Sequence, residues 1–274
     1  MLLTLAANSL RSYLRPDRTG AQKLRLIDLP RFARDEFGLH GLNFSTDLLA
    51  GSDYERLDQV RDAADKACCP CLVLVESEPQ AFAEEDDDLG DVAVDRLIRV
   101  AKAANRLGCN SMALTISGVK DADDMDRAAE RLKDALRAAE RLEVNVLLGT
   151  SPSGLLALPD SLTDLIKKVG GFRVGTFPDF QAASNSADPP QYLRRLTPYA
   201  QGVTASVVTF KAPKKGGPPA HEPYDLVEYT KAIASVGYTG TLAIEVRGEG
   251  DPAATIRSAT AVLQGALGAE ADQS

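Results

Sequence analysis

The sequence is poor in several features that would point to particular functions. No uninterrupted apolar run reaches the roughly 18 residues that a membrane-spanning helix needs, so we expect no membrane partner. Lysine and arginine number 31 against 39 aspartate and glutamate residues, which leaves a net charge of −8. Nucleic-acid binding needs a basic surface, so we expect none. The first residues lack the basic stretch of a signal peptide.

Cysteine is also scarce, with four residues in 274. Three of them, Cys68, Cys69 and Cys71, form a cluster, and Cys109 is distant in the sequence. A structural zinc site would need a second CxxC or a pair of histidines, and neither is present. We therefore predict buried thiols, or thiols on the face opposite an active site. Free thiols are usual in the cytoplasm, which is the compartment we expect.

What the chain does have is a regular alternation of short apolar runs and longer helical stretches. Several of the runs are nearly continuous in Val, Leu, Ile and Ala, as expected for parallel strands buried on both faces. The eight predicted strands are 2–7, 41–44, 72–75, 112–116, 144–148, 173–177, 203–208 and 241–246. One strand per roughly 33 residues is typical of a (β/α)8 TIM barrel of the α/β class. We predict one domain over residues 1–274, with residues 268–274 as a flexible tail.

A doubly wound open sheet is the alternative architecture for this pattern. Such a sheet commonly carries a glycine-rich phosphate-binding turn after its first strand. Here the first strand is followed by Ala7-Asn8-Ser9-Leu10, which contains no glycine. This absence favours the closed barrel.

In a barrel, functional side chains lie at the carboxyl ends of the strands and in the loops that follow. The predicted strand ends are polar throughout, with Asn8 after the first. Two carboxylates stand out, because Asp179 and Glu245 each lie where an apolar run gives way to a Gly- or Pro-rich loop. The ends of the fifth and seventh strands, at Gly149 and Ser206, carry neither an acid nor an imidazole.

These residues resemble a known family, the xylose isomerase-like TIM barrels, also described as sugar phosphate isomerases/epimerases. The resemblance covers nearly the whole chain and is strongest in segments 106–111, 175–180, 237–240 and 243–245. In that family a divalent metal is typically held by two Glu, one Asp and often one His. The resemblance implies that Asp179 and Glu245 are metal ligands, and that Glu245 is also a catalytic residue that moves protons on a sugar.

The match to the family's metal site is incomplete. Relatives usually have a Glu at the end of strand 5 and a His or Lys at the end of strand 7. Here these positions are occupied by Gly149 and Ser206. Two carboxylates would bind Mn2+, Mg2+, Co2+ or Zn2+ weakly or not at all. For Asp179 a polar plug or a helix cap is the alternative to ligand contact. For Glu245 the alternative is an internal ion pair with Arg247, two residues further on. Two histidines also exclude the three-zinc endonucleases of the superfamily.

Further candidate substrate-binding residues are Asn8, Arg247, His221 and Lys214. His221 and Lys214 belong to a segment after the seventh strand that could close over an anionic sugar. Two functional hypotheses follow, both with a sugar or sugar phosphate as the partner and with homo-oligomerisation left open. The first is an isomerase/epimerase that moves a proton within a sugar. The second is a non-catalytic protein that binds a sugar or polyol, or acts as a scaffold, on the same fold.

Overall fold

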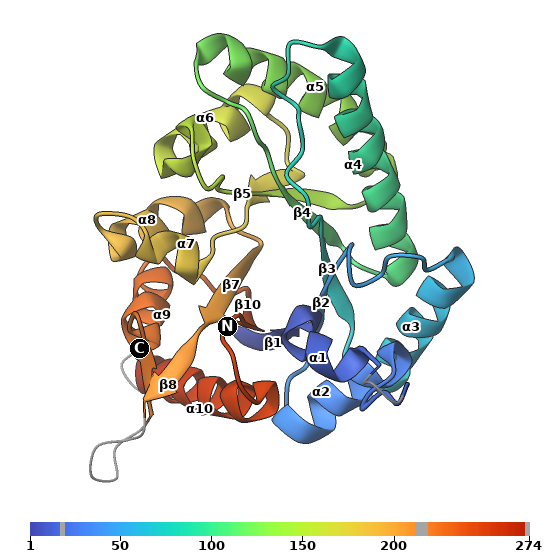
Figure 1. Ribbon diagram of the computed structural model, residues 1–274. Coiled ribbons are helices and arrows are strands. Elements are labelled where there is room, and N and C mark those ends of the chain that lie inside the picture. The colour runs from blue at the N-terminus through green and yellow to red at the C-terminus, as the bar shows by residue number, and fades with distance from the viewer. Residues whose placement is uncertain (17–19, 212–218, 272–274) are drawn as a thin grey trace.

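The computed structural model, which describes residues 1–16, 20–211 and 219–271, is a (β/α)8 barrel (Figure 1). Eight parallel strands form one sheet, in the order β6-β5-β4-β3-β2-β1-β10-β7. They are β1 (Leu2–Ala6), β2 (Leu42–Ser45), β3 (Cys71–Val75), β4 (Ser111–Thr115), β5 (Asn145–Gly149), β6 (Val174–Thr176), β7 (Gly202–Val207) and β10 (Thr241–Val246). All eight predicted strands are confirmed, with end points shifted by at most two residues.

Helices form a ring around the strands, as Figure 1 shows. They are α1 (Arg11–Leu14), α2 (Leu29–Phe37), α3 (Tyr54–Lys66), α4 (Asp87–Leu107), α5 (Ala122–Arg141), α6 (Pro159–Val169), α7 (Phe180–Ser184), α8 (Pro189–Leu196), α9 (Leu226–Ala234) and α10 (Pro252–Ala271). Residues 268–271, which we assigned to a flexible tail, continue α10, and 272–274 lie outside the described residues. None of the described helices has the length and apolar character needed to cross a bilayer.

Aspartate side chains start many of these helices. Asp53, Asp121 and Asp225 each accept a hydrogen bond from a backbone N–H in the first turn of the helix that follows. Such caps satisfy N–H groups that have no partner inside the helix. Gly38 and Gly108 end α2 and α4 with φ of 66° and 81°, a left-handed conformation that favours glycine.

The barrel closes between β6 and β7 without a regular ladder. Two isolated bridges join this seam, Thr176 with Ala200 and Asp179 with Thr204. The backbone N–H of Thr204 donates to the carbonyl of Pro178 at 2.9 Å. This irregular closure places Asp179 beside the end of β7.

The main core lies between the strands and the helices, and a smaller apolar cluster is formed by the middle residues of β3, β4 and β5. Val73, Ala113 and Leu147 form this inner cluster, with Phe177 packed against it. Above it, alternate positions of the strands face inward and carry mostly small side chains, because the side-chain period of a strand is two. Small residues at Ala6, Gly149 and Thr204 leave a cavity there.

Candidate functional site

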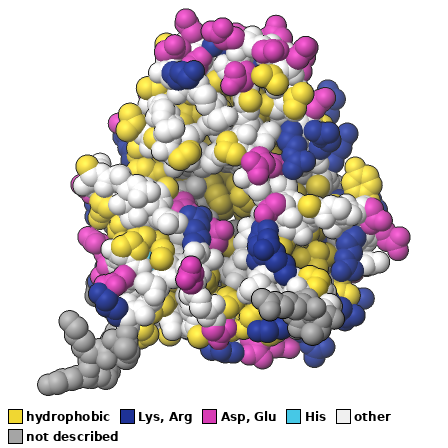
Figure 2. Space-filling model, in the orientation of Figure 1, with side chains coloured by type: hydrophobic (Ala, Val, Ile, Leu, Met, Phe, Trp, Pro, Cys, Tyr) yellow, Lys and Arg dark blue, Asp and Glu magenta, His cyan; other side chains and the backbone are white. Residues whose placement is uncertain are grey.

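A cavity of about 730 Å³ opens at the carboxyl ends of the strands. Figure 2 looks onto this face of the molecule and shows the hollow at its centre. The lining includes residues of β1, β2, β3, β4, β5, β7 and β10, and of the segments after β5 and β6. This is the position at which barrels of this class place their chemistry. Asn8, Asp179, Glu245 and Arg247, all predicted site residues, line it together.

Asp179 is held in place by the first turn of the helix that follows it and by a neighbouring strand. It caps α7, its Oδ1 accepting a hydrogen bond from the Ala182 N–H at 2.9 Å. The hydroxyl of Ser206, on β7, donates to its Oδ2 at 2.8 Å. The helix-cap alternative for Asp179 is therefore confirmed.

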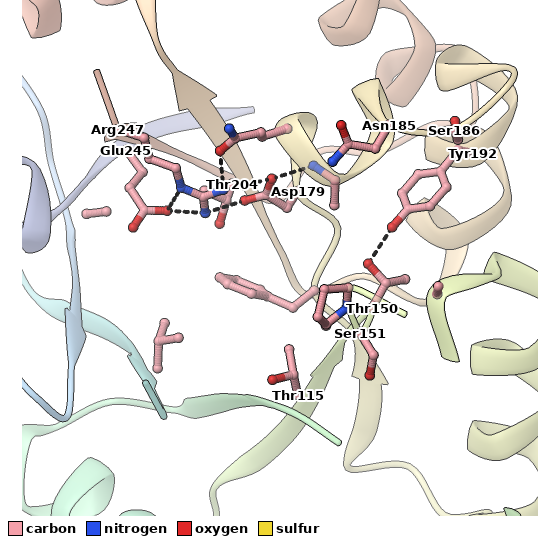
Figure 3. A pocket seen from close by; sticks show the side chains of 18 of the residues that line it. Thr115, Thr150, Ser151, Asp179, Asn185, Ser186, Tyr192, Thr204, Glu245 and Arg247 are labelled. Carbon is pink, nitrogen blue, oxygen red and sulfur yellow. Dashed lines mark hydrogen bonds and ion pairs between the residues drawn. The ribbon is translucent and has the colours of Figure 1, made fainter. Parts of the chain in front are cut away.

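Arg247 lies between the two carboxylates and binds both (Figure 3). Its Nη2 donates to Asp179 Oδ2 and to Glu245 Oε2, each at 2.6 Å. Its Nη1 donates to Asp179 Oδ1 at 3.2 Å and to Gln181 Oε1 at 2.9 Å. Its Nε donates to Glu245 Oε2 at 3.1 Å. A guanidinium has five N–H groups, and all five are used here.

The charges of this triad, Asp179, Glu245 and Arg247, stabilise one another. Burial alone would lower the pKa of Arg247, but the carboxylates of Asp179 and Glu245 raise it above its usual value. Arg247 therefore stays charged at all accessible pH. Together the three side chains carry one net negative charge when both acids are ionised.

The residues present do not fit the divalent metal that the family resemblance implies. A carboxylate offers about four acceptor positions, and Asp179 uses four, two toward Arg247 and one each toward Ala182 and Ser206. Within the described residues, no group of three or more His, Cys, Asp and Glu side chains could hold a metal. The Arg247 guanidinium supplies the cation that joins Asp179 to Glu245. The metal-ligand role predicted for these two acids stays a prediction, which their pairing with Arg247 does not favour.

Glu245 keeps one oxygen available. Its Oε2 accepts from Arg247 twice, whereas its Oε1 has no hydrogen-bond partner among the residues that the structure describes. The side chain is 19% exposed and lines the cavity. Glu245 can therefore accept a hydrogen bond from a ligand hydroxyl. The catalytic role predicted for it stays a prediction.

His221 does not contribute to the cavity, contrary to the substrate-binding role that we predicted. It lies on β9 (Ala220–Glu222), which forms a short hairpin with β8 (Thr209–Lys211). Its Nε2 accepts from the Val208 N–H, so its Nδ1 carries the proton and donates to the Tyr224 carbonyl, both at 2.8 Å. Burial lowers the pKa of the ring. His221 thus stabilises the hairpin, and Lys214, the other residue predicted there, lies outside the described residues.

A supporting layer lies behind the triad. The hydroxyl of Tyr224 donates to the Ser206 carbonyl at 2.7 Å, and its ring stacks on Tyr229 at 5.1 Å between centroids. Tyr229 in turn meets Phe180, the residue after Asp179, edge-on at 5.5 Å. These contacts hold β7 and the start of α7 in a fixed relation, and so position Asp179.

Several lining residues were not among the predicted site residues. Gln181 and Asn185 come from α7 and the residue after it, and Asn43 lies on β2. Asn43 is 4% exposed, and its buried Oδ1 has no hydrogen-bond partner in the described part of the chain. Its place at a strand end was the only signal in the sequence. Asn8 lines the cavity as predicted, with its Oδ1 accepting from Arg11 and Ser45.

The four cysteines lie away from this site. Cys69, Cys71 and Cys109 are buried and Cys68 is exposed. Burial raises the pKa of Cys69 to about 11 and that of Cys71 to about 12. The prediction of buried thiols is confirmed for three of the four.

The fold agrees with a comparison against models of known protein families. The family model described as "Xylose isomerase-like TIM barrel" matches residues 34–266, and the chain belongs to that family. A comparison with curated protein sequences finds no match.

Three solved structures illustrate the similarity in fold. An L-ribulose 3-epimerase has a TM-score of 0.79 at 16% identity, covering 100% of this chain and 98% of its own. D-psicose 3-epimerase from Clostridium cellulolyticum H10, solved with D-tagatose, has 0.72 at 15% identity, with 98% and 97% covered. A xylose isomerase-like TIM barrel protein from Mycobacterium smegmatis, in complex with magnesium, has 0.67 at 18% identity, with 97% of each chain covered.

Proposed function

We propose that this protein binds a neutral sugar or polyol at the mouth of its barrel, without a divalent metal. The observation that carries the proposal is the bonding of Arg247, whose five N–H groups are all directed to Asp179, Glu245 and Gln181. A guanidinium with no free donor cannot polarise a substrate carbonyl by direct contact. Of the two hypotheses from the sequence, the non-catalytic binding protein is better supported than the metal-dependent epimerase.

The charge of the cavity supports a neutral ligand in preference to a sugar phosphate. Among its described lining residues, Arg247 is the one Lys, Arg or His side chain, and it is paired with two carboxylates. Phosphate recognition needs free cationic donors or backbone N–H groups at a helix N-terminus. Two helices begin in the cavity lining: α7 is already capped by Asp179, and α6 has no side-chain cap but begins with Pro159, which has no N–H to offer.

The unpaired polar groups of the cavity suit hydroxyl groups. Glu245 Oε1 is an acceptor, the Gln181 amide nitrogen is a donor, and the hydroxyls of Thr115 and Thr204 can do either. Within the described residues these atoms have no hydrogen-bond partner, and all four residues line the cavity. The neighbours solved with D-fructose and D-tagatose are sugar epimerases, which supports the same class of ligand for this chain.

The test is a thermal-shift and calorimetric screen of D-fructose, D-tagatose, D-psicose and myo-inositol, with EDTA and with MnCl2. We expect at least one of them to stabilise the protein equally in both conditions. We also expect no epimerisation when the sugars are followed by NMR in D2O. Binding that requires Mn2+, or carbon-bound deuterium incorporated in a metal-dependent manner, would instead establish the epimerase hypothesis.

A matched pair of variants locates the binding. Thr204→Val removes a cavity hydroxyl while keeping the shape of the side chain, whereas Thr209→Val makes the same change on the exposed surface of β8. One lost hydrogen bond should weaken ligand binding by roughly 3- to 10-fold in Thr204→Val. Thr209→Val should bind as the wild type does. Equal affinities in the two variants would place the ligand elsewhere.

A further inference from the structure

The cavity has two chemically different walls. The wall formed by the triad, Gln181 and Thr204 presents three of the four unpaired polar groups described above, those of Glu245, Gln181 and Thr204. The opposite wall consists of the segment after β5, whose lining residues include Pro152, Ala157, Leu158 and Pro159. Phe177, partly exposed in the barrel interior, lies at the base of the cavity.

The side-chain hydroxyls of the segment after β5 are satisfied within the protein, whereas Thr115 on the neighbouring strand β4 keeps a hydroxyl that is unpaired within the described ranges. The hydroxyls of Thr150 and Tyr192 bond each other at 2.5 Å (Figure 3). The hydroxyl of Ser151 donates to the Ile116 carbonyl. These groups therefore offer little to a ligand hydroxyl, and the wall presents mainly carbon to the cavity. The apolar character of this wall does not depend on the contacts of Arg247.

Leu158 is the large exposed apolar side chain of this wall. Its relative exposure is 57%, and among the large exposed apolar residues in the described ranges it is the one that lines the cavity. Leu158 precedes Pro159, the first residue of α6, so its backbone is held by the start of that helix. Apolar surface at the rim of a polar site is removed from water when a ligand with apolar surface binds there.

The size of the cavity is consistent with a ligand larger than one sugar. At about 730 Å³ it lies in the upper half of the range for sites that hold drug-sized ligands, roughly 300–1,000 Å³. A free monosaccharide, with about a dozen non-hydrogen atoms, would leave much of this space and the apolar wall in contact with water.

We propose, building on the function proposed above, that the ligand is an amphipathic glycoside, a neutral sugar that carries an apolar aglycone. The sugar lies against Glu245, Gln181 and Thr204, and the aglycone lies against Phe177, Pro152 and Leu158. The apolar wall then selects glycosides over free sugars, because covering it removes apolar surface from water.

The experiment compares methyl and phenyl glycosides of D-glucose, D-galactose and D-mannose by calorimetry on the full chain. For the sugar that binds, we expect the phenyl glycoside to bind at least about tenfold more tightly than the methyl glycoside. Leu158→Ser should reduce this preference several-fold. Leu89→Ser is the matched control, since Leu89 is 50% exposed on α4 and does not line the cavity.

The outcomes separate this inference from the proposed function. Equal binding of methyl and phenyl glycosides, or a preference that Leu158→Ser leaves intact, overturns the inference while the binding of neutral sugars stands. If neither these glycosides nor the free sugars and polyol of the earlier screen bind, both proposals fail. A preference reduced by Leu158→Ser but not by Leu89→Ser supports the amphipathic ligand.

Discussion

Arg247 and Asp179 form a two-point ion pair across the seam where the barrel closes, with N–O distances of 2.6 and 3.2 Å. Asp179 follows β6, and Arg247 follows β10, the strand that pairs with β7. The pair therefore bridges β7, whose own ladder to β6 is missing. It joins the two sides of the seam and occupies both carboxylate oxygens of Asp179.

Replacement of Arg247 should destabilise the protein. Arg247→Gln leaves two partly buried carboxylates without their cation, and we expect the free energy of unfolding to fall by about 2 kcal/mol, the side chain being 36% exposed and so partly screened. Urea denaturation measures this change. Arg257→Gln, which breaks an exposed pair with Glu36, should cost less than about 1 kcal/mol. Equal losses would show that the triad makes no special contribution.

Replacing Arg247 should allow the site to bind a divalent metal weakly. We expect MnCl2 and MgCl2 to leave the melting temperature of the wild type unchanged relative to NaCl of equal ionic strength. Arg247→Ala frees acceptor positions on Asp179 and Glu245 and should acquire weak stabilisation by millimolar Mn2+. Adding Asp179→Asn to that variant should abolish the effect. A specific Mn2+ shift in the wild type would contradict the site as described.

Gly248 should tolerate no side chain. A Cβ at this position would lie 1.7 Å from the carbonyl oxygen of Val208, so the chain that carries Arg247 would have to move. We expect Gly248→Ala to lower the free energy of unfolding by about 3 kcal/mol or more and to weaken ligand binding. Gly265→Ala, in α10 with open space around it, should be neutral or stabilising.

Stability should decrease as the pH falls below about 6.5, in part because of His221. Burial lowers the pKa of this ring in the folded protein, so the unfolded chain, with an ordinary pKa near 6.5, binds the proton first. Protonation also removes the acceptor for the Val208 N–H. Urea denaturation at about pH 7.5 and about pH 5.5 should show a smaller pH dependence in His221→Gln than in the wild type. His40→Gln, at an exposed position, should retain the wild-type dependence.

Thiol labelling should separate one cysteine from the other three. Cys68 is exposed, whereas Cys69, Cys71 and Cys109 are buried, with pKa values raised by burial. A thiolate reacts far faster than a thiol. We expect a chromogenic disulfide reagent to label one residue quickly in the native protein and four after denaturation. Cys68→Ser should abolish the fast phase, and fast labelling of two or more residues would contradict the buried cluster.

The sequence was sufficient to predict the fold because strand and helix patterns are local. Runs such as 72–75 and 241–246 are apolar over several consecutive residues, and parallel strands buried on both faces require this. The position of Asp179 and Glu245 at strand ends also predicted that they share one cavity. Barrel geometry brings all strand ends to one face, and both residues line it.

The hydrogen-bond partners of Asp179 and Glu245 could be predicted only in part from the sequence. The pair between Glu245 and Arg247 could be weighed, since the two residues are two positions apart and face the same side of one strand. The bonds from Arg247 to Asp179 and Gln181 join residues more than sixty positions apart. His221 was misassigned because a histidine in a loop looks the same whether its nitrogens face a cavity or the backbone.

The sequence by itself determined the order of strands and helices, and therefore the barrel. Strands buried on both faces need runs of consecutive apolar residues, and these runs can be read directly from the sequence. The pairing of charges at the mouth was decided by closure of the barrel, because which donor meets which acceptor depends on distances across the ring. Such distances leave no trace in the spacing of residues. The chain alone therefore identified two acids that share one cavity, and the folded arrangement decided that a guanidinium joins them there.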